Sequence, residues 1–303
     1  MKKIKNIKQD FEKGKTSKHD FIQNLFKLHN ILFDFSHSLT DTQINEILIK
    51  ENNVLFKLNN NLIFNIDEFD KRTAGIESFN FNSYEPELSD ILLKLSSQCE
   101  YVFDIGANIG WYSLHFSLKE NTNIYSFEPI TKIYEQLEKN ISLNKKENIK
   151  AFNLALTDTE GEVEFFYDPL NATASSEKNI LDTDLEPVIC KQIPLDIFVK
   201  KNKIEKMDLI KCDVEGAEIK VIKGGLNTIK LHKPIIFLEM LRKWSLKFGY
   251  HPNEIINILT EVGYKCFSIG NNIKPINEIN DNTLETNFMF LHGLKHNSII
   301  NEI

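Results

Sequence analysis

The sequence has few cysteines and no excess of positive charge. Its four cysteines, Cys99, Cys190, Cys212 and Cys266, are far apart and form no Cys-x-x-Cys pair. Neither a zinc site nor a disulfide framework is therefore predicted, and free thiols are typical of a reducing cytoplasm. The net charge of −7 argues against nucleic acid as a partner, because proteins that bind it usually present a basic face.

Long hydrophobic runs are also missing. The sequence contains no stretch of about 18 apolar residues, and its basic N-terminus lacks the apolar core of a signal peptide. No transmembrane segment is predicted, and the expected location is cytoplasmic, with peripheral association at the inner membrane left open. The 303 residues, 42% of them hydrophobic, are enough for one main domain with an extension.

Residues 1–84 carry no chemical motif and are expected to form an N-terminal extension. Residues 1–50 are predicted to be mainly helical, because apolar side chains recur there at helical spacing. These side chains include Phe21, Leu25, Leu28, Leu32 and Phe35. Two apolar runs around an Asn-rich turn predict a hairpin over residues 53–67. The extension is expected to be a packing cap or the contact of a possible homodimer; alternatively, it helps to close a substrate pocket.

From residue 85 to residue 303, predicted strands and helices alternate. The strands are Tyr101–Ile105, Asn123–Phe127, Ile149–Leu154, Asp208–Cys212, Ile235–Leu238, Tyr264–Ile269 and Asn287–Leu291. The helices are Pro86–Leu95, Trp111–Leu118, Thr131–Asn144, Ala217–Lys223 and Asn253–Glu261. A hairpin-like stretch at Gly161–Tyr167 and a polar loop at Asn171–Leu185 interrupt the rhythm. The pattern predicts an α/β domain with a doubly wound, Rossmann-like, mostly parallel sheet that binds ligands at the carboxyl ends of its strands.

The segment from Tyr101 to Gly110, YVFDIGANIG, predicts a buried strand, a tight turn and the start of a helix. Such units hold nucleoside-bearing ligands in α/β proteins. A dinucleotide-binding turn has a middle glycine where this sequence has Asn108. The carboxylate of Asp104 would repel a diphosphate but attract the ammonium group of an amino acid. S-adenosylmethionine, which is both a nucleoside and an amino acid, is therefore the predicted ligand.

Carboxylates also follow other predicted strands. Glu128 comes 18 residues after Gly110, where an acidic side chain can accept hydrogen bonds from both ribose hydroxyls; the alternative is a favourable charge at a helix N-terminus. Asp213 and Glu215 follow one strand in the segment DVEGAE, and Glu239 ends another. Like charges this close are costly unless a cation or a proton shares the site. For each acid taken singly, the alternative is helix capping or a surface position. This alternative explains poorly why acids follow several predicted strands at equivalent ends.

These motifs together resemble the FkbM family of S-adenosylmethionine-dependent methyltransferases. The matching segments are Phe103–Gly110, Phe127–Pro129, Leu154–Asp158, Ile210–Glu218, Lys223–Gly225, Pro234–Glu239 and Gly263–Phe267. The resemblance covers roughly residues 85–292, and DVEGAE is its most specific part. It implies a class I methyltransferase fold with a seven-stranded sheet whose last strand is antiparallel. It also implies O-methylation, often of sugars or natural products.

The resemblance further implies roles for individual residues. The cofactor-binding residues would be Asp104, Gly106, Ala107, Asn108, Gly110, Glu128, Pro129, Ala155 and Asp158. Of these, Glu128 would hold the ribose, whereas Ala155 and Asp158 would lie near the adenine. The catalytic residues facing the transferred methyl group would be Asp213, Glu215 and Glu239. Residues 1–84 inherit no role.

The expected reaction transfers a methyl group to a hydroxyl of a saccharide or glycoconjugate, such as bacterial surface carbohydrate. An alcohol is a poor nucleophile at neutral pH, so a base or a metal must help to remove its proton. Asp213 or Glu239 is the predicted base. A divalent cation such as Mg²⁺ held by Asp213, Glu215 and Glu239 is a less favoured alternative.

The segment that follows the Glu239 strand contains three candidate contacts of the acceptor. Arg242 and Trp244 could bind a sugar or an anion, or simply begin a solvated helix, and His251 could be a second base. Two other functions stay open. One is an oxidoreductase that uses NAD or a nucleotide sugar, which Asn108 disfavours, and the other is a catalytically silent binding module of the same fold.

Overall fold

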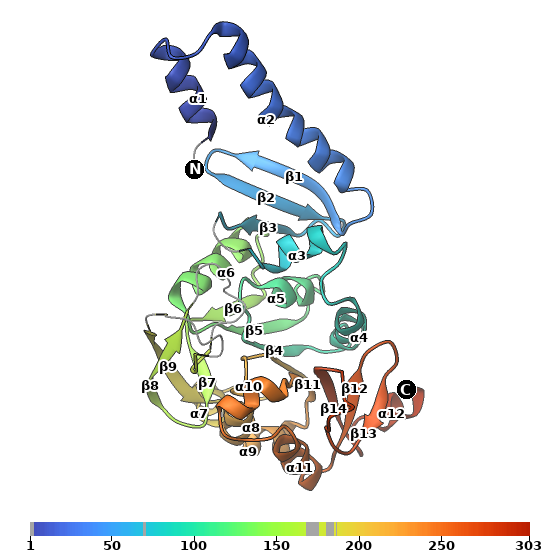
Figure 1. Ribbon diagram of the computed structural model, residues 1–303. Helices are drawn as coiled ribbons and strands as arrows, with labels where there is room; N and C mark the ends of the chain where they lie inside the picture. Colours follow the sequence, from blue (N-terminus) through green and yellow to red (C-terminus); the bar gives the residue numbers. More distant parts are fainter. Residues whose placement is uncertain (1–2, 69–70, 168–175, 180–184, 186) are drawn as a thin grey trace.

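The centre of the protein is an eight-stranded sheet in the order β13-β12-β14-β11-β10-β4-β5-β6, seen in the computed structural model of Figure 1. The structure describes residues 3–68, 71–167, 176–179, 185 and 187–303. The strands of this sheet are β4 Tyr101–Ile105, β5 Asn123–Phe127, β6 Ile149–Phe152, β10 Leu209–Cys212, β11 Ile235–Glu239, β12 Tyr264–Ile269, β13 Lys274–Ile276 and β14 Asn287–His292. Strands β11, β10, β4, β5 and β6 are parallel, whereas β14 is antiparallel to both its neighbours. The predicted α/β fold and its antiparallel last strand are confirmed, and the short edge strand β13 adds one strand to the predicted seven.

Both faces of the sheet are covered by helices, because its central strands are apolar on both sides. In β4, Val102 belongs to one hydrophobic cluster and Phe103 to the other. The first cluster includes residues of α4 Pro86–Ser96, α5 Trp111–Phe116 and α6 Thr131–Leu143. The second includes residues of α7 Leu195–Lys201, α8 Glu218–Gly224, α9 Leu226–His232 and α11 Asn253–Glu261. This double covering is the reason why the strands read as continuous apolar runs.

A second, smaller sheet lies beside the central one. Its order is β7-β9-β8, formed by β7 Ala155–Thr157, β8 Gly161–Phe166 and β9 Pro187–Pro194. The stretch expected to be hairpin-like is thus the single strand β8, which pairs antiparallel with β9. The polar loop expected at Asn171–Leu185 lies mostly outside the described residues.

The N-terminal extension begins with helices and continues as a sheet of its own. Its helices are α1 Lys3–Glu12, α2 Lys18–Ser38 and α3 Ala74–Asn80, and its strands are β1 Ile44–Lys50, β2 Asn53–Leu58 and β3 Ile63–Ile66. The predicted hairpin is confirmed as β2 and β3. The prediction of helix up to residue 50 is wrong for β1, which pairs antiparallel with β2. Isoleucines at positions 44, 47 and 49 favour a strand once a partner strand is present.

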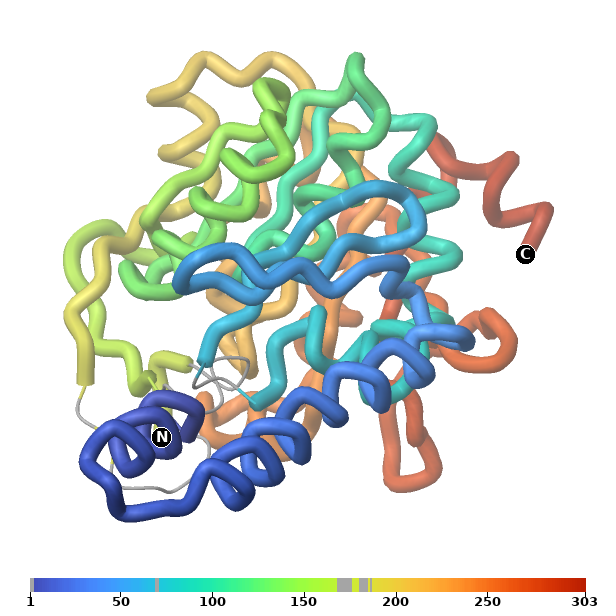
Figure 2. The backbone as a smooth tube through the Cα atoms, turned by 90° about the horizontal axis from the view of Figure 1, so that it is seen from above, coloured from blue at the N-terminus to red at the C-terminus, as the bar shows by residue number. Residues whose placement is uncertain are grey.

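The sheet of the extension packs on the helices of the main domain. Figure 2 shows β1–β3 crossing above α5 and α6. The side chain of Asn140 accepts a hydrogen bond from the Asn65 backbone N–H at 2.8 Å, and Asn144 accepts one from Ile63 at 2.8 Å. The ring of Phe64 lies 4.9 Å from that of Trp111. No helix of the described residues is long and apolar enough to cross a membrane.

Remaining helices complete the chain around the sheet. Helix α10 spans Arg242–Lys247 after β11, and α12 spans Asn297–Glu302 at the C-terminal end. Because α10 follows the carboxyl end of β11, it lies beside the edge of the sheet where the parallel strands end. This edge is the place where doubly wound folds bind their ligands.

Candidate active site

A cavity of about 440 Å³ opens at the carboxyl ends of β4, β5, β10 and β11. Its volume lies within the range of about 300–1,000 Å³ typical of small-molecule sites. Of the described predicted residues, those that line it are Gly106, Ala107, Asn108, Glu128, Pro129, Ala155, Asp213, Glu215, Glu239 and Trp244. Those that lie outside its wall are Asp104, Gly110, Asp158, Arg242 and His251. The fold thus brings most of the predicted residues to one place.

The glycine turn after β4 packs directly against the turn after β10. Gly106 has a φ of +76°, and a Cβ built on it would lie 1.8 Å from the backbone oxygen of Asp213. Only glycine is compatible with this approach and this backbone conformation. The N–H groups of Gly106 and Ala107 both donate to the Phe127 carbonyl, at 3.0 and 2.9 Å. The turn is therefore fixed to β5 and β10 together, which places it at the cavity floor.

Gly110 has a different role in the turn. Its φ is +88°, and a Cβ at this position would meet the side chain of Leu137 on α6 at 2.5 Å. It allows α5 to begin close to α6 and does not face the cavity. Its part in ligand binding stays a prediction.

Glu128 is held in place by the backbone beside the glycine turn. Its Oε2 accepts a hydrogen bond from the Asn108 N–H at 3.1 Å, and its Oε1 accepts one from Ile130 at 3.0 Å. Only 5% of the residue is exposed, and burial raises its pKa to about 7. Each carboxylate oxygen has a further lone pair, so Glu128 could accept two more hydrogen bonds from a ligand.

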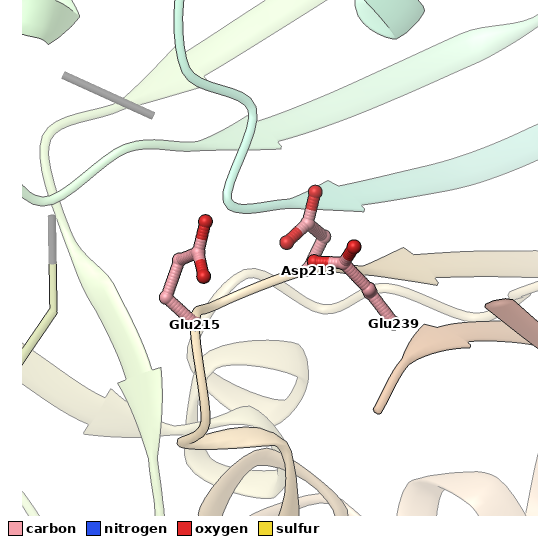
Figure 3. Close-up of side chains that lie close together, drawn as sticks. All are labelled: Asp213, Glu215 and Glu239. Carbon is pink, nitrogen blue, oxygen red and sulfur yellow. The ribbon is translucent and has the colours of Figure 1, made fainter. Parts of the chain in front are cut away.

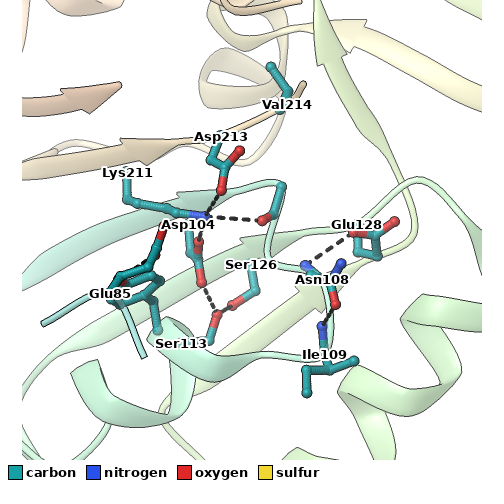
Figure 4. A network of polar contacts seen from close by, with 12 residues as sticks. Glu85, Asp104, Asn108, Ile109, Ser113, Ser126, Glu128, Lys211, Asp213 and Val214 are labelled. Atoms are coloured by element: carbon teal, nitrogen blue, oxygen red, sulfur yellow. Dashed lines mark hydrogen bonds and ion pairs between the residues drawn. The ribbon is translucent and has the colours of Figure 1, made fainter. Parts of the chain in front are cut away.

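A buried lysine, Lys211, joins the predicted acids Asp104 and Asp213 (Figure 4). Its Nζ lies 3.7 Å from Asp104 Oδ1 and 3.4 Å from Asp213 Oδ2, and it donates to the Gly106 carbonyl at 3.2 Å. Burial acts to lower the pKa of Lys211, but the charges of Asp213, Asp104 and Glu85 outweigh it and raise this pKa. No role was predicted for Lys211 from the sequence, although a lysine in an otherwise apolar strand is a visible signal.

Asp104 is fully buried behind the cavity wall. Its Oδ2 accepts a hydrogen bond from the Ser113 hydroxyl at 2.5 Å, and Ser113 contacts Ser126 at 2.7 Å. Burial raises the pKa of Asp104, against the opposing effect of Lys211. The cation beside Asp104 in this structure is thus the protein's own lysine. A direct contact between Asp104 and a ligand stays a prediction.

Asp213, Glu215 and Glu239 converge on one point of the cavity (Figure 3). One carboxylate oxygen from each lies within 4.8 Å of the other two. Burial, followed by the charge of Asp213, raises the pKa of both Glu215 and Glu239 well above the usual range. Protons therefore relieve the repulsion in this cluster. Three carboxylate oxygens are also a donor set that suits a hard cation such as Mg²⁺, and this alternative stays untested.

The next acid, Glu218, belongs to the fold and not to the cavity. Its Oε1 accepts hydrogen bonds from the N–H groups of Val214 and Gly216 at 3.2 and 3.1 Å. Its Oε2 accepts one from the Tyr250 hydroxyl at 3.1 Å. Burial raises the pKa of Glu218 to about 7. Glu218 therefore fixes the shape of the loop that carries Asp213 and Glu215.

The three candidate acceptor contacts have different places in the structure. Trp244 lines the cavity, and Lys243 Nζ lies 4.0 Å from the centre of its ring. Arg242 pairs with Asp281 at 2.7 Å and does not line the cavity. The ring nitrogen of His251 accepts from the Asn253 N–H at 3.3 Å. The structure thus brings Trp244 to the site, but not Arg242 or His251.

A group of cavity residues from the extension, from the residue before α4 and from α5 was not predicted from the sequence. Five of them are Arg72, Glu77, Tyr84, Glu85 and Tyr112. The Tyr112 hydroxyl donates to Glu85 at 2.7 Å, and Arg72 pairs with Glu77 at 2.7 Å. Burial and the charge of Asp213 raise the pKa of Glu85. Arg72 and Tyr84, near the two ends of the last segment of the extension, thus both line the cavity. No sequence motif marks these residues.

Comparisons with known proteins show the family of the chain. Residues 104–266 match the family model of the methyltransferase FkbM domain. The hexuronic acid methyltransferase AglP of Haloferax volcanii is 25% identical over 177 residues, which cover 58% of this chain and 68% of AglP. The 2-O-methyltransferase NoeI of Sinorhizobium fredii is 25% identical over 145 residues, 42% of this chain and 58% of NoeI. Among solved structures, an FkbM methyltransferase from Methylobacillus flagellatus has a TM-score of 0.42 and 16% identity, covering 74% of this chain and 55% of its own.

Proposed function

Because the chain belongs to the FkbM methyltransferase family, we propose that it is an S-adenosylmethionine-dependent O-methyltransferase for a hydroxyl of a saccharide or glycoconjugate. One observation carries the proposal. The glycine turn, the buried carboxylate of Glu128 and the cluster of Asp213, Glu215 and Glu239 line a single cavity. A site for a nucleoside and a group able to take a proton are thus adjacent.

The turn side of the cavity fits S-adenosylmethionine. Glu128 has lone pairs left for the two ribose hydroxyls, and Asn108 and Ala107 present the backbone of the turn. Ala155 lines the cavity at the start of β7, where a small side chain leaves room for the adenine. Acidic side chains outnumber basic ones in the cavity lining, which suits a sulfonium and an ammonium group better than the diphosphate of NAD.

The acidic side of the cavity fits the chemistry of methyl transfer. When bound, S-adenosylmethionine supplies an electrophilic methyl group, and as the new C–O bond forms, the electron pair of the broken C–S bond stays on sulfur. The protein has to align the acceptor hydroxyl and take its proton. Lys211, 3.4 Å from Asp213, stabilises negative charge on this carboxylate, so we assign the base role to Asp213. Burial and the charge of Asp213 raise the pKa of Glu239. This favours its protonated form, which can hold the acceptor by a hydrogen bond.

The remaining wall of the cavity supports a sugar as the acceptor. Tyr84, Trp111 and Trp244 offer aromatic surfaces for the apolar faces of a sugar ring, and Glu77 and Glu85 offer acceptors for its hydroxyls. The names of the relatives AglP and NoeI, a hexuronic acid methyltransferase and a 2-O-methyltransferase, agree with this class of acceptor. Bacterial surface carbohydrate is the acceptor we propose.

The proposed location is the cytoplasm, with peripheral contact at the inner membrane. The four cysteines are free and buried, which suits a reducing compartment.

Calorimetric titration of the full chain with S-adenosylmethionine and with NAD tests the donor. We expect binding heat with S-adenosylmethionine only. Heat with NAD alone would support an oxidoreductase, and heat with neither ligand would support a silent binding module. Glu128→Ala is expected to weaken S-adenosylmethionine binding about 10- to 100-fold, the loss of hydrogen bonds to a charged group. Glu135→Ala, at an exposed position on α6, is the matched control and should bind normally.

The role of Asp213 is tested separately. Asp213→Asn should bind S-adenosylmethionine as the wild type does, but lose about 10²- to 10⁴-fold in turnover, the contribution of general-base catalysis. Turnover is measured as S-adenosylhomocysteine release with a panel of sugars and glycoconjugates, with and without a chelator. Normal turnover of the variant would disprove the base assignment, and loss of turnover in the chelator would support the metal alternative.

A further inference from the structure

The arm formed by α1, α2 and their connection, residues 3–38, exposes many apolar side chains. No residue of this fully described segment is buried. The large apolar side chains that are at least 36% exposed are Ile4, Phe11, Ile22, Phe26, Ile31, Leu32, Phe33 and Phe35. Single exposed apolar residues are ordinary, but a contiguous patch marks an interaction surface. Three of these side chains, Ile22, Phe26 and Phe33, recur at the spacing of one face of α2, so the arm has an exposed apolar face.

The N-terminal part of the arm has an excess of positive charge, whereas the chain as a whole is acidic. Residues 1–18 contain seven lysines and two acidic residues, a net charge of +5, whereas the whole chain carries −7. The other 285 residues therefore carry −12. One of the acids, Asp10, lies 3.6 Å from Lys15. The partner of this surface must accept apolar side chains and lysines together, and anionic lipid head groups above acyl chains do so.

The geometry of the arm suits a flat surface. On α1, Ile4, Ile7 and Phe11 recur at the spacing of one helix face, and Lys5 and Lys8 at that of another. The ring of Phe11 stacks on Phe21 of α2 at 4.3 Å, which holds the two helices together. Figure 1 shows the arm at one end of the molecule, beyond β1–β3 and far from β12 and β13. The arm can therefore meet a surface without obstruction from the main domain.

We propose that this arm docks the enzyme on a membrane surface that contains anionic lipids. A second copy of the chain fits less well, because a twofold contact through the arm would bring together two segments that each have seven lysines and four acidic residues, a net charge of +3. The arm is also connected to the cavity. Phe35 on α2 lies 5.5 Å from Phe79 on α3, the helix that contributes Glu77 to the cavity wall. Docking would thus hold the acceptor side of the cavity near the lipid head groups.

Co-sedimentation of the full chain with vesicles tests this proposal and needs no methyl donor. One set of vesicles contains phosphatidylglycerol in phosphatidylcholine, and the other is pure phosphatidylcholine. Binding is expected to the first set only and should weaken at high salt. Replacing Lys3, Lys5 and Lys8 by Gln should weaken it about 100-fold, because each surface lysine contributes roughly a factor of five.

Matched variants separate docking from misfolding and from self-association. The control replaces three exposed lysines of α9, β12 and β13, Lys230, Lys265 and Lys274, by Gln, and should bind as the wild type does. Phe26→Ser with Phe33→Ser should abolish binding while circular dichroism shows an intact fold. Equal binding to both vesicle sets, or equal losses in the two triple variants, would overturn the proposal. So would a stable dimer in light scattering that Phe33→Ser dissociates, together with no binding to vesicles.

Discussion

Removing the charge of Lys211 is the sharpest test of how the acidic site is held together. In Lys211→Met, Asp104 and Asp213 lose the ammonium group that lies 3.7 and 3.4 Å away. At an effective dielectric constant near 20, each of these pairs is worth about 4–5 kcal/mol of gross attraction. The recovered desolvation of the lysine offsets part of this sum. Breaking a buried pair from one side then leaves a net loss of about 3–5 kcal/mol in the free energy of unfolding.

Urea denaturation at neutral pH measures this loss, with Lys206→Met as the control. Lys206 also pairs with two carboxylates, Glu100 at 2.7 Å and Asp208 at 3.6 Å, but its side chain is 48% exposed. Exposed pairs are screened by solvent, so this variant should lose about 1 kcal/mol or less. Two lysines with similar distances to their partners are thus predicted to differ several-fold in their effect, because only one is buried.

A second substitution identifies the cause of the loss. Asp104 has no other cation beside it in the described network (Figure 4), so Lys211→Met leaves a buried carboxylate uncompensated. Adding Asp104→Asn removes this charge and should restore part of the stability. An unfolding midpoint of Lys211→Met equal to that of Lys206→Met would refute the reasoning, and so would a double variant less stable than the single one.

Two further predictions concern the loops around the site. Gly106→Ala should lower the free energy of unfolding by roughly 4 kcal/mol or more, since its Cβ would lie 1.8 Å from the Asp213 carbonyl. The control Gly14→Ala, at a φ of +69° with no atom within 4 Å, should lower it by only about 1–2 kcal/mol. Equal urea midpoints of the two variants would contradict this prediction. Glu218, whose pKa burial raises from 4.5 to about 7, adds stability that is complete below pH 4.5 and is lost as the pH rises through 7. Glu218→Gln should therefore remove up to about 3 kcal/mol of the fall in unfolding free energy across this window, and an unchanged pH profile would show that the carboxyl is not buried in this way.

Much of the central sheet could be predicted because its signals are local. The predicted spans of β4, β5, β12 and α11 agree with the structure at both ends. Each strand is a short apolar run bounded by polar or turn residues, and each helix has its own apolar period. The prediction of helix over β1 failed because the same residues fit a strand as soon as β2 offers its hydrogen-bonding edge.

The acidic side of the cavity was predictable for a topological reason. Parallel strands place their carboxyl ends on one edge, so acids that end separate strands, such as Asp213 and Glu239, had to converge. The cavity wall from the extension was not predictable, since Arg72, Glu77 and Tyr84 carry no motif and reach the cavity through the packing of the extension on the main domain. Arg242 was predicted to contact the acceptor, as Trp244 was, but in the structure it pairs with Asp281.

The order of the strands and helices, the turn of Gly106 and the acids at the strand ends were predictable from the sequence, because they depend on neighbouring residues and on the topology of a parallel sheet. The pairing of Lys211 with Asp104 behind the cavity wall became visible only in the folded chain, and so did the two roles of the extension, which lines the cavity with Tyr84 and exposes the apolar arm. Charges and apolar surfaces act through space. Their partners are therefore set by which distant segments the folded chain brings together, and burial then determines how strongly they interact.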